Sequence, residues 1–84
     1  MAHGKTIREW EQAVEQRSDI EFIQMNLRNG RVDSVIGIVK QPCKRKYRGV
    51  THFRSRRVRW NAFGECLSMY GTNSADLSGF NIFS

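Results

Sequence analysis

The chain has 84 residues, enough for one small domain, and hydrophobic residues make up 39% of it. They are spread along the chain, which favours a folded domain over a disordered one. The formal net charge of +6 is unevenly placed, because residues 40–59 carry nine Lys and Arg and no Asp or Glu. A cationic band of this kind indicates an anionic partner.

Three further absences narrow the class of protein. Charged residues interrupt the apolar segments well before the length of a membrane span. The first residues contain no apolar core of a secretory signal, and two cysteines do not suggest a disulfide framework. The expected location is therefore the cytoplasm, of a bacterial cell or of an infected host.

The segment TIREWEQAVEQR predicts the first element, a helix from about Ile7 to Arg17. Thr6 and Glu9 have the spacing of a capping box, in which each side chain accepts a hydrogen bond from the other residue's backbone. Trp10 falls on the apolar stripe of this helix. A helix of three turns is marginal alone, so the stripe is expected to dock on a sheet.

Two β-rich runs then flank Asn29-Gly30, a pair that predicts a hairpin with a type I′ turn. The expected register pairs Leu27 with Val32 and Ile23 with Ile36 on one face, and Phe22 with Gly37 and Ile20 with Val39 on the other. The open end of the hairpin is thus apolar on both faces. The helix is expected to cover one face, and later strands or the C-terminal residues part of the other.

The basic segment after Pro42 predicts a second ribbon. Its strands, 47–54 and 57–63, are joined through Ser55-Arg56 in the expected register. Phe53, Val58 and Trp60 would lie on its apolar core face. The opposite face would carry Arg48, His52, Arg54, Arg57, Arg59 and Phe63.

The remaining residues predict a short strand over Cys66 to Tyr70, a polar loop over 71–79, and an apolar end, 80–83. The apolar end is expected to pack back on the sheet, with an edge strand as one form of that packing. The expected fold is a single α+β domain over residues 1–84, with an N-terminal α-helix packed on a small antiparallel β-sheet of four to five strands.

The cationic face and the loop before it form the candidate binding site. A two-stranded β-ribbon fits the DNA major groove, and Arg and Lys contacts to phosphates supply most of the affinity. The candidate nucleic-acid contacts are Lys44, Arg45, Lys46, Arg48, His52, Arg54, Arg57, Arg59 and Phe63, the last by stacking on an unpaired base. DNA and RNA both remain open as partners.

Two other interpretations of the cationic band remain open. The protein can be a small inhibitor or adaptor that docks on an acidic host protein surface. The band can also be a solvated face without an anionic partner.

The stretch KYRGVTHFRSRRVRWNAF resembles the first strands of AP2/ERF-type DNA-binding domains. That resemblance implies contacts from Arg48, Arg57, Arg59 and Trp60 in the major groove. The whole chain, through TIREWEQAV, RVRWNAFGECL and SADLSGF, resembles small accessory proteins of tailed phages and prophages. This second resemblance implies either a nucleic-acid-binding regulator or an inhibitor of a host protein.

Metal and catalytic motifs are weak. The spacing of His3, Cys43, His52 and Cys66 matches no zinc module, so no metal or other cofactor is expected. The chain contains no paired-carboxylate motif, no Cys/His or Ser/His signature and no Gly-rich phosphate loop. His52 among arginines is the one candidate for a nuclease base, and a non-catalytic protein is expected.

Overall fold

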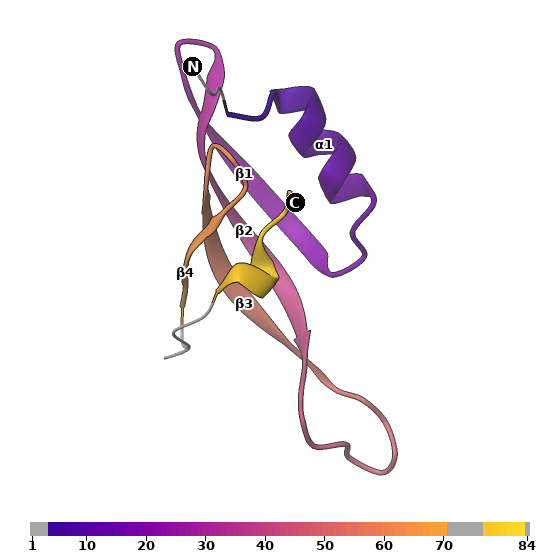
Figure 1. Ribbon diagram of the computed structural model, residues 1–84. Coiled ribbons are helices and arrows are strands. Elements are labelled where there is room, and N and C mark those ends of the chain that lie inside the picture. Colours follow the sequence, from indigo (N-terminus) through magenta and orange to yellow (C-terminus); the bar gives the residue numbers. More distant parts are fainter. Residues whose placement is uncertain (1–3, 71–76, 84) are drawn as a thin grey trace.

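The computed structural model describes residues 4–70 and 77–83, which form a helix on a four-stranded antiparallel sheet (Figure 1). The elements are α1 (Ile7–Glu15), β1 (Ile20–Arg28), β2 (Arg31–Pro42), β3 (Phe53–Asn61), β4 (Cys66–Met69) and a short 3₁₀ helix, η1 (Ser78–Phe80). The strands lie in the sheet in chain order. The predicted α+β architecture is confirmed, with four strands.

Helix α1 begins with the predicted capping box. The Thr6 hydroxyl accepts from the Glu9 backbone N–H at 3.1 Å, and the Glu9 carboxylate accepts from the Thr6 N–H at 3.2 Å. This hydrogen bond lowers the pKa of Glu9. The helix ends at Glu15 rather than at Arg17, because Gln16 is its cap and the Arg17 N–H turns back to the Val14 carbonyl.

The turn from α1 to β1 is held by a bidentate ion pair. The Arg17 guanidinium donates to the two carboxylate oxygens of Asp19 at 2.9 and 2.7 Å. These hydrogen bonds lower the pKa of Asp19 below its ordinary value of 3.8, against an opposing effect of partial burial.

Replacing Asp19 by Asn is expected to lower the free energy of unfolding at pH 7 by at most about 1 kcal/mol, because the pair is partly exposed and screened. A lowered pKa contributes stability above the unfolded-state value, and that contribution is lost as the pH falls through the folded-state value. The difference between wild type and variant should therefore shrink as the pH falls below 3.8. Urea unfolding at pH 7, 4 and 2.5 measures it, and a difference as large at pH 2.5 as at pH 7 would contradict this linkage.

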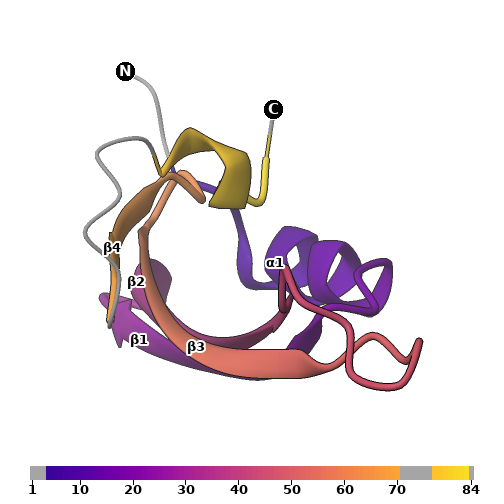
Figure 2. The same ribbon diagram turned by 90° about the horizontal axis from the view of Figure 1, so that it is seen from below.

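The sheet is curved, and both α1 and the C-terminal segment lie on its concave side (Figure 2). The concave face carries the buried core, which consists of Trp10 of α1 together with Val32, Val35, Val39, Val58, Trp60 and Met69. The expectation that later strands or the C-terminal residues cover part of the face opposite α1 is therefore wrong. The helix and the C-terminal residues both cover the concave face, and the convex face has no covering layer among the described residues.

Aromatic rings form the centre of this core. Trp10 lies 6.0 Å from Trp60 and 5.2 Å from Phe83, measured between ring centroids. The Trp60 indole N–H donates to the Phe80 carbonyl at 2.8 Å. Its six-membered ring lies over Gly37, where a Cβ would be only 2.5 Å from a ring carbon. The ring of Trp60 thus requires the glycine in β2.

Two β-bulges change the predicted register of the first hairpin. The pairs Arg28–Arg31, Leu27–Val32 and Ile20–Val39 are as expected, but between them Ile23 pairs with Gly37 and Phe22 with Ile38. One shift lies between Asn26 and Leu27 and the other between Ile20 and Phe22. The bulges let Ile20, Ile23, Val32 and Val35 all pack on the core.

The apolar C-terminal residues pack on the core as predicted, but not as an edge strand. The Ile82 N–H donates to the Gly64 carbonyl, and the Asn81 side chain accepts from the Cys66 N–H at 2.7 Å. The short strand predicted over Cys66 to Tyr70 is confirmed as β4. Residues 71–76 of the predicted polar loop lie outside the described residues.

The predicted second ribbon is wrong. Residues 53–61 form the single strand β3, which pairs with β2 on one side and β4 on the other. The chain reverses at Arg48-Gly49 instead of Ser55-Arg56, because only the former pair adopts the positive φ angles that a tight hairpin turn requires. Among the described residues, no helix combines the length and apolar character needed to cross a bilayer.

Candidate nucleic-acid interface

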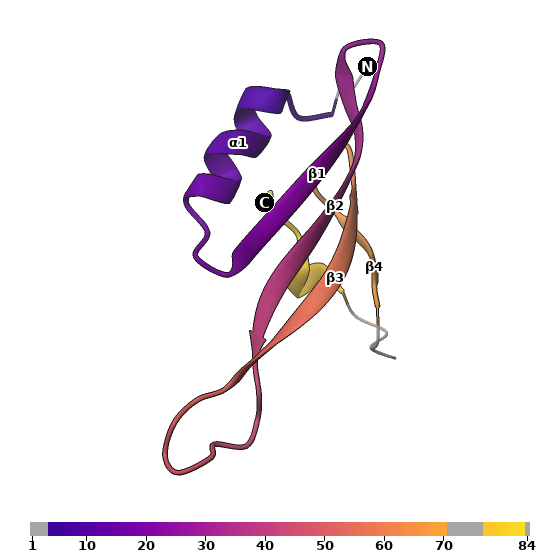
Figure 3. The same cartoon turned by 180° about the vertical axis from the view of Figure 1, so that it is seen from behind.

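The connection between β2 and β3, residues 43–52, projects beyond the rest of the sheet (Figures 1 and 3). We call this segment the arm. It is a continuation of the β2–β3 hairpin, since the Cys43 N–H donates to the His52 carbonyl and Tyr47 and Val50 exchange two backbone hydrogen bonds. The arm contributes to the elongated shape of the molecule, which measures 50 × 26 × 20 Å.

The tip of the arm is a two-residue turn with φ angles of 53° at Arg48 and 76° at Gly49. The β1–β2 turn has nearly the same angles, 53° at Asn29 and 75° at Gly30. Asn is favoured at the first of these positions because its short polar side chain can hydrogen-bond to the local backbone, whereas the long side chain of Arg offers no such compensation for the crowding of its Cβ. A cation therefore occupies the outermost turn at some cost in backbone energy, which points to a role outside the fold.

Replacing Arg48 by Asn is expected to leave the free energy of unfolding unchanged or to raise it by up to about 1 kcal/mol, while lowering affinity for an anionic partner. Asn29→Arg is the matched control, since it places Arg in the same turn geometry at the other end of β2. This control should lower stability by a similar amount and leave affinity unchanged. Thermal unfolding and binding titrations measure both, and a marked loss of stability in the Arg48 variant would contradict the argument.

The charged side chains of the arm are all cationic, and all are exposed: Lys44, Arg45, Lys46 and Arg48. Aromatic side chains lie close to these cations. The Arg48 guanidinium lies 5.4 Å from the centre of the Tyr47 ring, and the His52 ring lies 6.0 Å from it. Tyr47 is 62% exposed and Val50 58% exposed, so the arm presents apolar surface among its charges.

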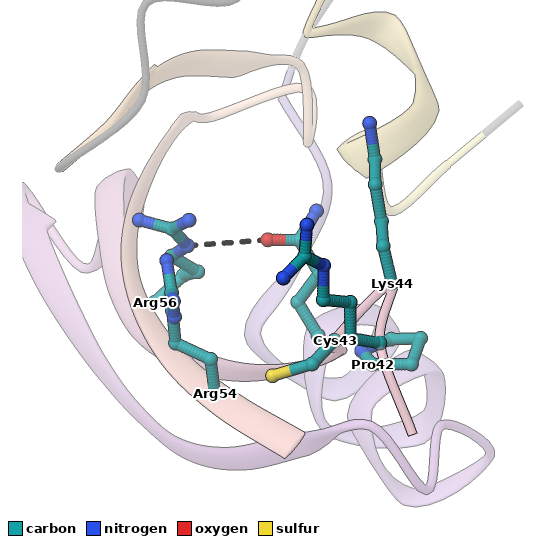
Figure 4. Close-up of a pocket in the computed structure, with 7 residues that line it drawn as sticks. Pro42, Cys43, Lys44, Arg54 and Arg56 are labelled. Atoms are coloured by element: carbon teal, nitrogen blue, oxygen red, sulfur yellow. Dashed lines mark hydrogen bonds between the residues drawn. The ribbon is translucent and has the colours of Figure 1, made fainter. Parts of the chain in front are cut away.

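A shallow cavity of about 570 Å³ lies where the arm leaves the sheet (Figure 4). Its described lining contains four cations and no carboxylate: Lys44 and Arg45 from the arm, and Arg54 and Arg56 from β3, with Gln41, Pro42 and Cys43. The Arg56 Nε–H donates to the Gln41 side-chain oxygen at 3.1 Å, which fixes its guanidinium (Figure 4). This cationic cavity is suited to an anionic group such as a phosphate.

The residues predicted for the site do not share one face. Arg54 pairs with Gln41 and lies on the concave side of β3, whereas Arg57 and Arg59 lie on its convex side. Arg48 lies in the arm, as do the predicted contacts Lys44, Arg45, Lys46 and His52. The single cationic face is therefore wrong, because residues on a strand alternate between its two faces.

The positions predicted for the aromatic side chains are also partly wrong. Val58 and Trp60 are fully buried, as expected, but Phe53 is 60% exposed at the base of the arm. Phe63 is 41% exposed in the β3–β4 turn, roughly 26 Å along β3 from that base. The structure does not bring Phe63 together with the arm cations. The inward position of Trp60 also removes it from the DNA contacts that the AP2/ERF-type resemblance implies.

Sequence reasoning missed Arg56 and Gln41, which lie together at the cavity, and Tyr47, which lies under Arg48. The Arg48-Gly49 pair was the signal that could have found them. A two-residue turn centred there makes β2 and β3 neighbours. Its own register would pair Gln41 with Arg56, and the observed pairing of Gln41 with Arg54 is shifted from it by two residues.

Metal chemistry gains no support from the described residues, among which no group of three or more His, Cys, Asp or Glu is placed to hold an ion. His3, one of the four weak candidates, lies outside them. Cys43 and Cys66 are free thiols, and burial raises the pKa of Cys66. Cys66 is therefore protonated at neutral pH and packs against the core.

Comparison of the chain with protein-family models, with curated proteins and with solved structures finds no match.

Proposed function

We propose that this protein is a non-catalytic nucleic-acid-binding protein that engages its target through the arm. The observation that carries the proposal is the projecting hairpin whose charged side chains are all cationic and exposed. A cation also occupies its tip at a backbone conformation that favours Asn or Gly. Lysine and arginine at such a position gain affinity for phosphates by releasing the counterions condensed on nucleic acid.

The dimensions of the arm are compatible with a groove of a double helix. Two paired strands lie about 4.8 Å apart, and the major groove of B-DNA is about 12 Å wide and 8.5 Å deep. Five residues precede the turn and three follow it, and the shorter side limits the reach of the arm beyond the sheet to about 13 Å. With the tip in the groove, the cavity at the base of the arm would meet the phosphates that border the groove.

Arg48 at the tip is the residue suited to base recognition. Arginine presents a planar pair of donors to the O6 and N7 acceptors of guanine in the major groove. The nearby ring of Tyr47 limits the orientations of its guanidinium. Lys44, Arg45, Lys46 and Arg54 then contribute phosphate contacts, which position the arm without reading sequence.

The resemblance to phage accessory proteins supports a regulatory setting for this activity, as a phage or prophage regulator. The compartment proposed for it is the cytoplasm of a bacterial cell or an infected host. No step of the proposal requires catalysis, a metal or another cofactor.

An acidic protein surface is the second candidate partner. The observation that favours it is the apolar surface of the arm, where Tyr47, Val50 and Phe53 are each more than half exposed. Rings at the centre of an interface, surrounded by cations, are typical of protein contacts. In this form the protein would be an inhibitor or adaptor that inserts the arm into an acidic groove of a host protein.

The test is a fluorescence-anisotropy titration with labelled duplex DNA, duplex RNA and single-stranded DNA at two salt concentrations. If about five to seven phosphates are neutralised on duplex DNA, the slope of log K against log salt should be roughly −5 to −6. Far-UV circular dichroism provides the control that the protein is folded.

Failure of the folded protein to bind any of the three at ~50 mM salt would remove the proposal. A stoichiometric acidic host protein in a pull-down, lost on substitution of arm residues, would then support the second candidate.

A further inference from the structure

The convex face of the sheet is a second surface, separate from the arm and its cavity. Two rows of side chains cross it. In the first, Phe22 of β1 pairs with Ile38 of β2, which pairs with Arg57 of β3. In the second, Gln24 pairs with Ile36, Ile36 with Arg59, and Arg59 with Ser68 of β4. Each row thus places an isoleucine between a β1 side chain and an arginine.

An exposed ring stands at each side of this face. Phe22 is 56% exposed on β1, and Tyr70, which follows β4, is 82% exposed. The Tyr70 backbone N–H donates to the Arg57 carbonyl at 2.9 Å, which holds the Tyr70 backbone beside β3. A shallow cavity of about 420 Å³ lies beside Tyr70, lined by Ile36, Arg57, Arg59, Ser68, Met69 and Tyr70 itself.

We propose that the convex face binds single-stranded nucleic acid. Unpaired bases would stack on Tyr70 and Phe22 over the isoleucines, and Arg57 and Arg59 would contact the backbone. An open surface with exposed rings and a positive charge is suited to this ligand, because every base has a face that stacks and every nucleotide a phosphate. The inference shares with the proposed function only the class of partner.

The charges on the convex face argue against a second copy of this chain as its occupant. Two convex faces packed about a twofold axis would bring Arg57 and Arg59 of both copies into one largely apolar interface. Burying unpaired like charges in this way is costly. Lys40 lies on the same face, next to Ser55, and adds to the repulsion. The carboxylate of Glu21 accepts a hydrogen bond from Ser55 at the end of this face nearest the arm.

The geometry of β3 offers a matched pair of variants. Arg57→Gln removes a charge from the convex face, and Arg54→Gln removes the same charge from the concave face of the same strand, three residues away. Both side chains are exposed, so neither change removes core packing. Affinities are measured for a labelled 12-nucleotide oligo(dT) and for a duplex of mixed sequence at ~0.1 M salt.

Arg57→Gln combined with Tyr70→Ala is expected to lower oligo(dT) affinity at least about tenfold, by loss of one phosphate contact and one stacked base, and to leave duplex affinity within about twofold. Arg54→Gln should lower the affinity for the duplex and leave the affinity for oligo(dT) within about twofold. Photocrosslinking with 5-iodouracil in the oligonucleotide should modify Tyr70 or Phe22.

Three results would overturn the inference: equal effects of the two variants on both ligands, crosslinks confined to the arm, or a wild-type dimer that the convex-face variant dissociates. Binding of duplex without oligo(dT) would remove this inference and leave the proposed function standing. Loss of binding to every nucleic acid would remove both.

Discussion

Replacing Lys44 and Arg45 together by Gln is expected to lower the affinity for duplex DNA roughly 60-fold at 0.1 M salt. Each phosphate contact contributes about 0.9 to the slope of log K against log salt, which is nearly a factor of 10 at this concentration. The slope itself should become less steep by about 1.8. Both side chains are exposed and line the cavity at the base of the arm, so the fold should be unaffected. Anisotropy titrations from 50 to 300 mM salt measure both quantities.

The matched control removes the same charge from the body of the molecule. Arg8 on α1 and Arg28 at the end of β1 are exposed and lie away from the arm. Their joint replacement by Gln should change the affinity only through net charge, by about threefold or less at 0.1 M salt. Equal losses in the two double variants would show that overall charge, not the arm, determines binding.

Replacing Trp60 by Ala is expected to lower the free energy of unfolding by about 3–5 kcal/mol. Trp60 is fully buried, packs on Trp10 and lies over Gly37. The change also leaves the Phe80 carbonyl without the indole donor, which weakens the attachment of the C-terminal segment. Since a domain of this size has a total stability of about 5–15 kcal/mol, the variant should unfold at markedly lower urea or temperature.

Leu67→Ala is the control for the core prediction, because this side chain is 51% exposed on β4. This substitution should lower the free energy of unfolding by less than about 1 kcal/mol. The Trp60→Phe variant should fall between the two, since it retains part of the ring packing and loses the hydrogen bond. A Trp60→Ala variant as stable as Leu67→Ala would mean that the aromatic centre of the core is wrongly described.

The helix and the first hairpin could be predicted because their signals are local. Thr6 and Glu9 define the start of α1 through their own hydrogen bonds. Asn29-Gly30 defines the β1–β2 turn because few other pairs adopt positive φ at both positions. The bulges within that hairpin are not local in this sense. They arise because several residues of β1 and β2 pack on one curved core. The curvature depends on residues far apart in the sequence, so no local pattern predicts the bulges.

The structure of the basic segment was harder to predict, because the alternation of apolar and polar residues does not indicate where the chain reverses. A folded ribbon places Phe53, Val58 and Trp60 on one face, and that grouping favoured the wrong turn. In one strand, Phe53 lies on the face opposite Val58 and Trp60. The structure selects one strand, since β3 is central and must pair with both β2 and β4. Arg54 and Arg57 then lie on opposite faces, so one cationic band divides between two surfaces.

The proposal that the arm carries nucleic-acid binding is tested most directly by NMR. The ¹⁵N-labelled protein is titrated with a duplex DNA of about 12 base pairs, and amide chemical shifts are followed residue by residue. The amides of residues 43–52 and of Arg54 should shift or broaden together at one stoichiometry, while those of α1 remain unchanged. Shifts confined to α1 or the β1–β2 turn, with the arm unaffected, would contradict the proposal.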